Sequence, residues 1–356
     1  MTRNRAGSDG VPQSIMATYY AQRATAGLII AEASTPNAVG QTYPDITAIH
    51  APAHVEGWRQ VTDAVHAAGG RMFLQLQHGG RIGHPDTSGL TPVAPSPIAL
   101  PGTIFTPNGH QTPVVPREMT LDEIRATVAD FAAAARNALA AGFAGVEVHA
   151  ANGYLLHQFL AGGTNRRTDA YGGSVAGRIR FVVEVVRAVV EAVGAERTGL
   201  RISPGLTVNG IEEGDTEELY PALLDALAEA GLAYLHIVFA DPDQPLFQRI
   251  RRSWAGTLIA NPVLPRDQIP ADGGRHEGER LLAAGADLVA LGRPFLANPD
   301  LVERLRLGAP FNPVRDKYLM YVGRETGYTD YPALADDSPA PAGTHGQHRT
   351  PDALAS

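Results

Sequence analysis

Cysteine is absent from the chain, which excludes disulfide bonds, thiolate metal sites and a cysteine nucleophile. Lysine is almost absent: the only one is Lys317, near the C-terminal end, so a nucleophile of the Schiff-base kind has no other candidate. The sequence has no run of about eighteen apolar residues, which argues against a membrane-spanning helix. The N-terminus, MTRNRAGSDG, lacks the apolar centre of a secretory signal.

The charge balance is acidic, with a formal net charge of −8. A nucleic-acid partner would favour a basic face, so we expect none. The sequence also lacks a His-rich or HExxH metal motif, and no GxGxxG follows a strand, so neither a metal site nor a Rossmann dinucleotide site is expected. The 356 residues, 44% of them hydrophobic, suffice for one large α/β barrel or two smaller domains. These features predict a soluble cytoplasmic protein without a membrane partner.

Apolar periodicity predicts eight helices and seven strands that alternate strictly, beginning with a helix. Such alternation is typical of parallel βα units, and eight helices fit a (β/α)₈ TIM barrel. The predicted helices cover approximately residues 15–23, 55–65, 121–139, 175–190, 219–227, 246–254, 275–284 and 300–307. Two of them have N-terminal signals: Thr120 and Glu123 form a capping box before an apolar stripe, and Ser174 caps the next helix. The predicted strands cover residues 28–34, 71–78, 146–149, 199–204, 233–239, 257–261 and 286–292.

Two segments do not follow the alternation. Residues 79–119 are rich in Pro and Gly and too long for a plain connector, so we expect a lid or excursion over one barrel face. Residues 335–356 are rich in Ala, Pro, Asp and His without periodicity, and we expect a disordered tail. The prediction is therefore a single barrel domain, residues 1–334, followed by that tail.

The stretch from Val146 to Phe159 reads VEVHAANGYLLHQF and is the strongest candidate for a site. His149, Asn152 and Tyr154 offer two hydrogen-bond donors and a phenol just beyond a buried strand, where catalytic groups of barrels are found. The same pattern also fits a buried histidine bonded to a backbone carbonyl, an asparagine that holds a turn and a tyrosine packed in the core. Residue types alone leave both interpretations open.

Other polar or small residues stand where the predicted strands end, and active sites of such barrels lie at that face. Gly292 would let backbone approach a phosphate and Arg293 can bind one bidentately, although a tight turn with a solvated arginine explains the pair equally simply. Ordinary packing or an ion pair is likewise an alternative for each of the others. The strand-end residues are Glu32, Ala33, Gln75, His149, Arg201, Asn261, Gly292 and Arg293.

Three motifs resemble the Old Yellow Enzyme family of flavin-dependent ene-reductases. The family pattern H-x-x-[NH]-G-Y-L-L followed by Q-F-L is present without a gap from His149 to Leu160. NRRTDAYGGS spans residues 165–174 and GYTDYP spans residues 327–332. The resemblance extends over residues 1 to about 334. It implies a TIM barrel that binds FMN, takes hydride from NADPH or NADH, and reduces the activated C=C bond of α,β-unsaturated carbonyl or nitro compounds. Small electrophilic alkenes are the expected partners, and the expected state is a monomer or homodimer.

The resemblance also implies a role for each candidate. His149 and Asn152 match the pair that binds the activating oxygen of the substrate, and Tyr154 matches the acid that protonates the α-carbon. Gln77 and Tyr321 match positions that line the substrate pocket, Gln77 standing where several relatives have Trp. The residues that match flavin-binding positions are Thr2, Ala33, Gln75, Arg201, Asn261, Gly292 and Arg293.

The start of the chain raises a second hypothesis. In the family, a hairpin and the first barrel strand precede a Thr-Arg pair, and Met1-Thr2-Arg3 resembles the end of that sequence. We therefore expect the first barrel strand to be missing. Because an incomplete barrel exposes two unpaired edges, the alternative function is an unstable or inactive remnant of such an enzyme. A third hypothesis is a flavin-free lyase or isomerase that binds a sugar phosphate through Arg293.

Overall fold

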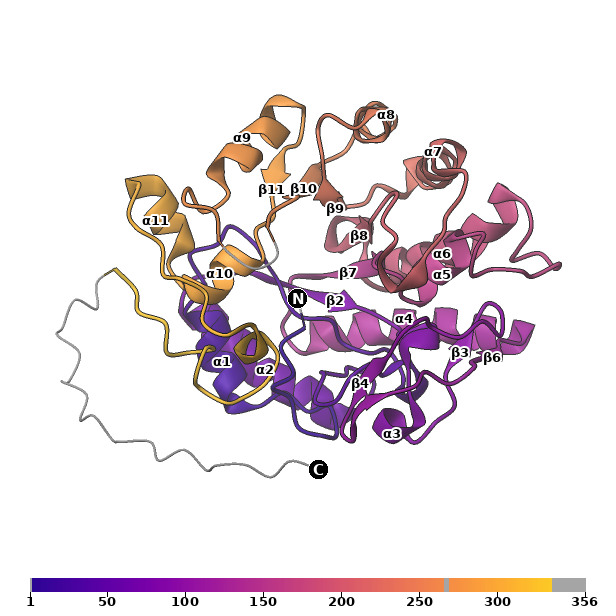
Figure 1. Cartoon of the computed structure of the whole chain (residues 1–356), viewed down its shortest axis with the longest axis horizontal. Helices are drawn as coiled ribbons and strands as arrows, with labels where there is room; N and C mark the ends of the chain where they lie inside the picture. The colour runs from indigo at the N-terminus through magenta and orange to yellow at the C-terminus, as the bar shows by residue number, and fades with distance from the viewer. Residues whose placement is uncertain (1, 266–268, 335–356) are drawn as a thin grey trace, which may run out of the picture.

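A parallel sheet of seven strands lies at the centre of the computed structural model (Figure 1), which describes residues 2–265 and 269–334. Neighbouring strands pair in the order β1-β2-β7-β8-β9-β10-β11, so each strand lies next to the one that follows it among these seven. This is the order of a barrel wall, and the seven predicted strands are confirmed. The strands are β1 (Ile29–Ile30), β2 (Met72–Leu76), β7 (Gly145–Ala150), β8 (Thr198–Ile202), β9 (Tyr234–Ala240), β10 (Leu258–Pro262) and β11 (Leu288–Val289).

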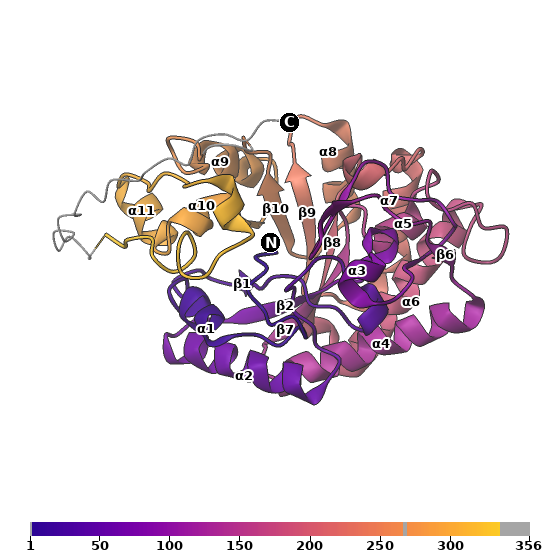
Figure 2. The same ribbon diagram turned by 60° about the horizontal axis from the view of Figure 1, so that its bottom comes forward.

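Helices surround the strands, as the two views agree (Figures 1 and 2). The eight predicted helices are all present, and each lies outside the sheet. Two of them begin where the sequence predicts: Thr120 caps α4 in a capping box with Glu123, and the Ser174 side chain caps α6. The helices are α1 (Ser14–Ala21), α2 (Pro52–Ala67), α4 (Leu121–Ala140), α6 (Val175–Val193), α7 (Thr216–Ala226), α8 (Pro245–Ser253), α9 (Arg275–Ala283) and α11 (Leu301–Leu307).

The two ends of the sheet are close to each other along the ring of helices. Arg23, just after α1, donates hydrogen bonds of 2.8 and 2.9 Å to the carbonyls of Phe295 and Leu296 in α10 (Arg293–Ala297). In the described part of the chain, β1 and β11 nevertheless pair on one side only. Both are much shorter than predicted, because an edge strand has a hydrogen-bonded neighbour on one side alone. The absence of a first strand stays a prediction.

The strands separate two environments. Val146 and Val148 on β7 belong to the large apolar core, which packs the sheet against the helices. Glu147 and His149 alternate with them and therefore point to the opposite face, inside the barrel. A second, much smaller apolar cluster around Phe73, Tyr234 and Ile259 fills part of that interior. The remainder of the interior is polar.

Residues 79–119 contain several short elements instead of one long loop. Strands β3 and β6 pair in parallel, and β4 and β5 form an antiparallel hairpin. Arg81 connects this excursion to the barrel, because its Nη2 donates to the carbonyls of Asn209 and Gly210 at 2.8 Å. The elements are α3 (Pro85–Ser88), β3 (Val93–Ala94), β4 (Ile104–Thr106), β5 (Gly109–Gln111) and β6 (Arg117–Glu118).

Besides α3, two short helices, α5 (Leu155–Leu160) and α10, were not predicted. Every residue of α5 is buried, so the helix has no polar face from which a helical period could be read. Among the described helices, none has the length and apolar content needed to cross a bilayer. The predicted disordered tail, residues 335–356, lies outside the described residues.

Candidate active site

The end of β7 and the turn after it carry the predicted catalytic residues. His149 is the penultimate residue of β7 and is 3% exposed. Asn152 adopts the left-handed backbone conformation, with φ of 57°, which asparagine tolerates better than most residues. Its backbone N–H donates to Ser203 Oγ and its carbonyl accepts from Asn209 Nδ2, both at 2.8 Å. The backbone bonds fix the turn and leave the Asn152 side chain free for a ligand.

His149 is a neutral imidazole near pH 7. Burial lowers its pKa well below the usual value, and the positive charge of Arg201, which is opposite His149 in the β7–β8 register, lowers it further. Its Nδ1 is buried and has no partner among the described residues, and the same is true of Asn152 Oδ1. The neutral imidazole of His149 and the amide of Asn152, each with a side-chain atom that has no partner, are thus only three residues apart in the chain.

Tyr154 lies beside His149, with a distance of 5.2 Å between the ring centroids. Burial raises the pKa of Tyr154 well above 10, and the neighbouring hydroxyl of Tyr43 adds to the rise. Tyr321 is 45% exposed, but it is close enough to raise the pKa of both Tyr43 and Tyr154 further. The structure therefore brings His149, Asn152, Tyr154 and Tyr321 into one region.

Four polar residues on neighbouring strands form what we call the interior polar cluster: Gln75, Glu147, Arg201 and His236. Gln75 Nε2 donates to Glu147 Oε1 at 2.7 Å, and His236 Nδ1 is 2.8 Å from Glu147 Oε2. Arg201 Nη1 is 3.8 Å from Glu147 Oε1, and its Nε has no partner in the described part. Glu147 is the common partner of the other three.

The charges of this cluster follow from its contacts. Burial alone would raise the pKa of Glu147, but His236, Arg201 and the Gln75 amide together outweigh burial and lower that pKa to about 2. Burial and the neighbouring Arg201 lower the pKa of His236. We therefore assign an ionised Glu147 that accepts Nδ1–H from a neutral His236.

The remaining predicted cofactor residues lie at other strand ends. Ala33 is buried after β1, and Gln77 is buried after β2 with an unpartnered Nε2. Asn261 on β10 uses its Nδ2 to bind the Ala290 carbonyl at 2.8 Å. Arg293 donates to the Pro265 carbonyl at 2.9 Å, and a side chain added at Gly292 would meet nothing within 4 Å. These residues share no recorded hydrogen bond with the interior polar cluster.

The N-terminal segment is firmly anchored. Thr2 is partly buried, and Arg3 beside it is 1% exposed. Arg3 donates from Nε to the Met320 carbonyl at 2.7 Å and from Nη1 to the Tyr19 hydroxyl at 2.6 Å. Arg5 donates to the carbonyls of residues 319 and 322 at 2.7 Å. The segment that carries Thr2 is therefore attached to the segment that carries Tyr321.

The sequence reading missed three members of this region. Glu147 had a usable signal: it precedes His149 by two residues on a strand and must share its face. His236 is opposite Arg201 in the register, but that pairing is visible only in the structure. Tyr43 lies in a long connection after β1, and no spacing in the sequence relates it to Tyr154.

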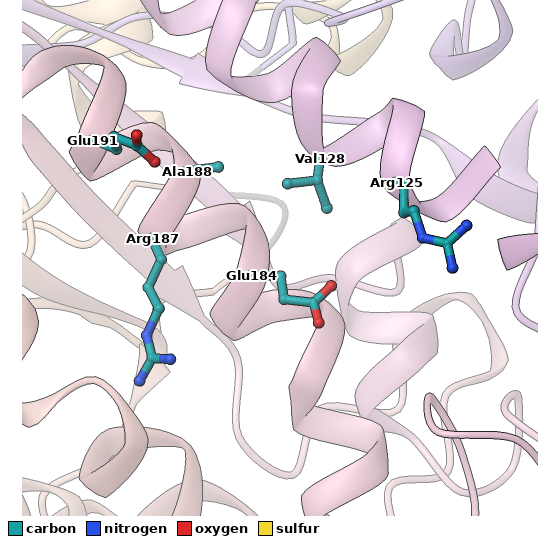
Figure 3. Close-up of a pocket in the computed structure, with 6 residues that line it drawn as sticks. All are labelled: Arg125, Val128, Glu184, Arg187, Ala188 and Glu191. Atoms are coloured by element: carbon teal, nitrogen blue, oxygen red, sulfur yellow. The ribbon is translucent and has the colours of Figure 1, made fainter. Parts of the chain in front are cut away.

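Two surface hollows lie away from these residues. One, of about 350 Å³, lies between α4 and α6 on the outer wall (Figure 3). Another, of about 460 Å³, is next to α6 and includes Arg167, Arg178 and Asp215. The first contains Arg125, Val128, Glu184, Arg187, Ala188 and Glu191. Neither hollow contains a predicted site residue. In the described residues, no group of three or more His, Asp or Glu side chains is placed to hold a metal ion.

Comparison with known proteins agrees with this architecture. The model of the NADH:flavin oxidoreductase / NADH oxidase family matches residues 1–312. A probable flavin mononucleotide-dependent alkene reductase from Leishmania infantum is 40% identical, over 94% of this chain and 92% of that protein. The structure of an Old Yellow Enzyme homologue from Zymomonas mobilis superimposes with a TM-score of 0.88 at 39% identity, over 94% of each chain.

Morphinone reductase in complex with tetrahydroNAD superimposes with a TM-score of 0.87 at 43% identity, over 96% of this chain and 93% of that one. These relatives favour a functional enzyme over the alternative of an inactive remnant. They also support the (β/α)₈ barrel as the fold to which the seven-stranded sheet corresponds. The chain therefore belongs to the NADH:flavin oxidoreductase family of Old Yellow Enzymes.

Proposed function

We propose that this protein is an FMN-dependent alkene reductase that uses NADPH or NADH to reduce the activated C=C bond of α,β-unsaturated carbonyl or nitro compounds. The observation that carries the proposal is the group at the end of β7. His149 and Asn152 keep polar side-chain atoms without partners, directly beside Tyr154. We expect the enzyme to act in the cytoplasm, as a monomer or homodimer, on small electrophilic alkenes.

The residues at the strand ends fit a flavin. A buried polar atom without a partner costs about 1–3 kcal/mol, and several such atoms face the same end of the barrel. They include Gln77 Nε2, His149 Nδ1, Asn152 Oδ1 and Arg201 Nε. A flat ring system with alternating donors and acceptors, together with a substrate bound next to it, would satisfy them. The open space at Gly292 suits the close approach of a phosphate.

Bound FMN would supply the chemistry for hydride transfer between the nicotinamide and the β-carbon of the alkene. Arg201 would stabilise negative charge on the pyrimidine edge, and Gln75 would bind the same edge. Arg293 would hold the phosphate, exchanging the Pro265 carbonyl for a charged acceptor. The resemblance assigns three further residues to the flavin site: Thr2, Ala33 and Asn261.

His149 and Asn152 would bind the carbonyl or nitro oxygen of the substrate. Both are neutral donors, so they polarise the conjugated alkene without placing a full positive charge next to Arg201. As negative charge develops on that oxygen, the two hydrogen bonds strengthen and lower the barrier. The fixed Asn152 backbone keeps the amide in place during the reaction.

Tyr154 would deliver the proton to the α-carbon. Because burial raises its pKa, the hydroxyl is protonated throughout the neutral range and is always ready to donate. The neighbouring hydroxyl of Tyr43 would help to orient that of Tyr154. Gln77 and Tyr321 would line the substrate pocket, where Gln77 adds polarity.

The test begins with the purified chain and added FMN. We expect a yellow protein that retains FMN through gel filtration and oxidises NADPH or NADH when 2-cyclohexenone is present. His149→Ala and Asn152→Ala should retain the flavin and lose most enone reduction. Glu191→Gln, on the outer wall, serves as a control that should behave like the unchanged chain. A folded, colourless protein that cannot be loaded with FMN contradicts the proposal.

A further inference from the structure

Glu147, the common partner in the interior polar cluster, has no role so far. It lies two residues before His149 on β7 and is fully buried. A buried carboxylate is costly unless its oxygens are bonded, and here both oxygens are occupied. Oε1 accepts from Gln75 and approaches Arg201, while Oε2 bonds to His236. Glu147 therefore connects three side chains from three different strands.

The first consequence concerns the Gln75 amide. Because Nε2 donates to Glu147, the amide cannot rotate to exchange its two ends without losing a charge-assisted bond. Gln75 Oε1 has no donor among the described residues. Gln75 is therefore kept as an acceptor toward whatever occupies the end of the barrel.

The second consequence concerns the charge of Arg201. Its guanidinium is partly buried, and the nearest opposite charge in the described chain is Glu147, 3.8 Å away. That distance is long for a full ion pair, so some of the donors of Arg201, including Nε, remain free. Glu147 therefore offsets the charge of Arg201 without occupying its hydrogen-bonding edge.

The third partner, His236, leaves the net charge of the cluster unchanged. As a neutral ring it donates Nδ1–H to Glu147 and adds no charge of its own. The cluster then contains one positive and one negative charge. If Glu147 were uncharged, nothing in the cluster would offset the positive charge of Arg201, and the ligand would be next to a net charge of +1.

We propose that Glu147 is a positioning residue for the flavin site: it fixes Gln75 as an acceptor, orients Arg201, and lowers the reduction potential of bound FMN by offsetting the charge of Arg201. This inference rests on the proposed function, since it requires that the site holds FMN. Reduction places negative charge on the flavin, so a nearby carboxylate disfavours the reduced state.

The decisive variant is Glu147→Gln. It removes the charge but keeps an acceptor for Gln75, and its amide can donate to His236 if that ring takes the other tautomer. We expect the equilibrium for two-electron reduction of bound FMN to shift at least tenfold toward the reduced form, about +30 mV. Dye-equilibrium titration of the FMN-loaded protein measures this shift. Glu191→Gln, which also removes one negative charge but lies on α6, should leave the potential unchanged.

Glu147→Asp keeps the charge and shortens the side chain by one methylene, so it cannot reach Gln75 and His236 together. We expect the equilibrium constant for reduction of bound FMN to stay within threefold of its value in the unchanged chain. The FMN dissociation constant, measured by flavin fluorescence, should rise at least fivefold. This variant also tests the inference if Glu147→Gln does not fold, which a thermal melt would show.

The outcomes separate the two proposals. If the unchanged chain does not bind FMN, the proposed function fails and this inference fails with it. If the chain binds FMN and Glu147→Gln shifts the equilibrium by less than threefold, only the inference fails. The same holds if Glu147→Asp binds FMN as tightly as the unchanged chain.

Discussion

His157 offers a demanding test of how the site is supported. It lies in α5, is fully buried, and was not assigned any role by its sequence pattern. Its Nδ1 accepts from the backbone N–H of Gly153 at 3.0 Å, and its Nε2–H donates to Glu213 at 2.7 Å. Gly153 directly follows Asn152. We predict that His157→Leu destabilises the fold and also disturbs the turn that presents the Asn152 amide.

The magnitude follows from what remains after the substitution. The Gly153 N–H loses its partner, which costs about 1–3 kcal/mol. Glu213 still accepts hydrogen bonds from the hydroxyl of Tyr220 and the backbone N–H of Gly205, so it loses only one of its partners. Complete loss of a partner from a buried pair costs about 3–5 kcal/mol. We therefore expect a total of about 3–5 kcal/mol, with a several-fold rise in the KM for 2-cyclohexenone.

The assay is urea unfolding at pH 7 together with steady-state kinetics. His66→Leu on the exposed face of α2 is the matched control, since it makes the same chemical change without burial, and it should alter stability by less than about 0.5 kcal/mol. In a double-mutant cycle, His157→Leu combined with Glu213→Leu should cost less than the sum of the two single changes. A loss below about 1 kcal/mol for His157→Leu, or strict additivity, would refute the reasoning.

Three further predictions use other parts of the structure. Tyr154→Phe should slow alkene reduction by about 10²–10⁴-fold while flavin reduction by the nicotinamide stays within about twofold, as stopped-flow absorbance can measure. Burial raises the pKa of Glu32 from 4.5 to about 6, so the folded state retains a proton that the unfolded state loses, and stability should fall by about 1.5 kcal/mol between pH 4.5 and 7. Glu32→Gln should abolish that fall, and urea midpoints at pH 4.5 and 7 test it. Arg3→Met should cost about 2 kcal/mol or more, because the Tyr19 hydroxyl loses a buried donor and the Met320 carbonyl keeps only Arg5 of its two; an unchanged midpoint contradicts this.

The fold followed from sequence pattern because its elements are long and amphipathic. The stripe on α4 and the caps at Thr120 and Ser174 predict helices whose positions the structure confirms. The errors lie where the pattern carries little information. Edge strands end early because their pairing depends on a neighbour, and α5 is buried on all sides. Local periodicity therefore predicts neither the ends of the edge strands nor the presence of α5.

The site was predictable in part, and for a different reason. Strand-end residues are local, so His149, Arg201 and Gln75 could be nominated without a structure, and the family motifs gave them roles. Their support is not local. Tyr43 and Tyr154 pack against the same small cluster, and His157 bonds to Glu213; in both cases the separation of the segments in the chain gives no signal. Sequence reading thus found groups that face the ligand and missed most of those that orient them.

The two ends of the described chain support the site together. Arg3 and Arg5 both bind carbonyls of the segment around Met320 and lie over the ring of Tyr328, with distances of 4.9 and 4.5 Å to its centroid. Thr2 and Tyr321, which the resemblance assigns to flavin and substrate, are next to these contacts. The N-terminal segment has no helix or strand in its described residues before α1, and the other has only the short 3₁₀ helix η6 (Lys317–Met320), so each depends on the other. A substitution of Arg5 should therefore change the affinity for substrate through Tyr321, although Arg5 itself lies outside the proposed pocket.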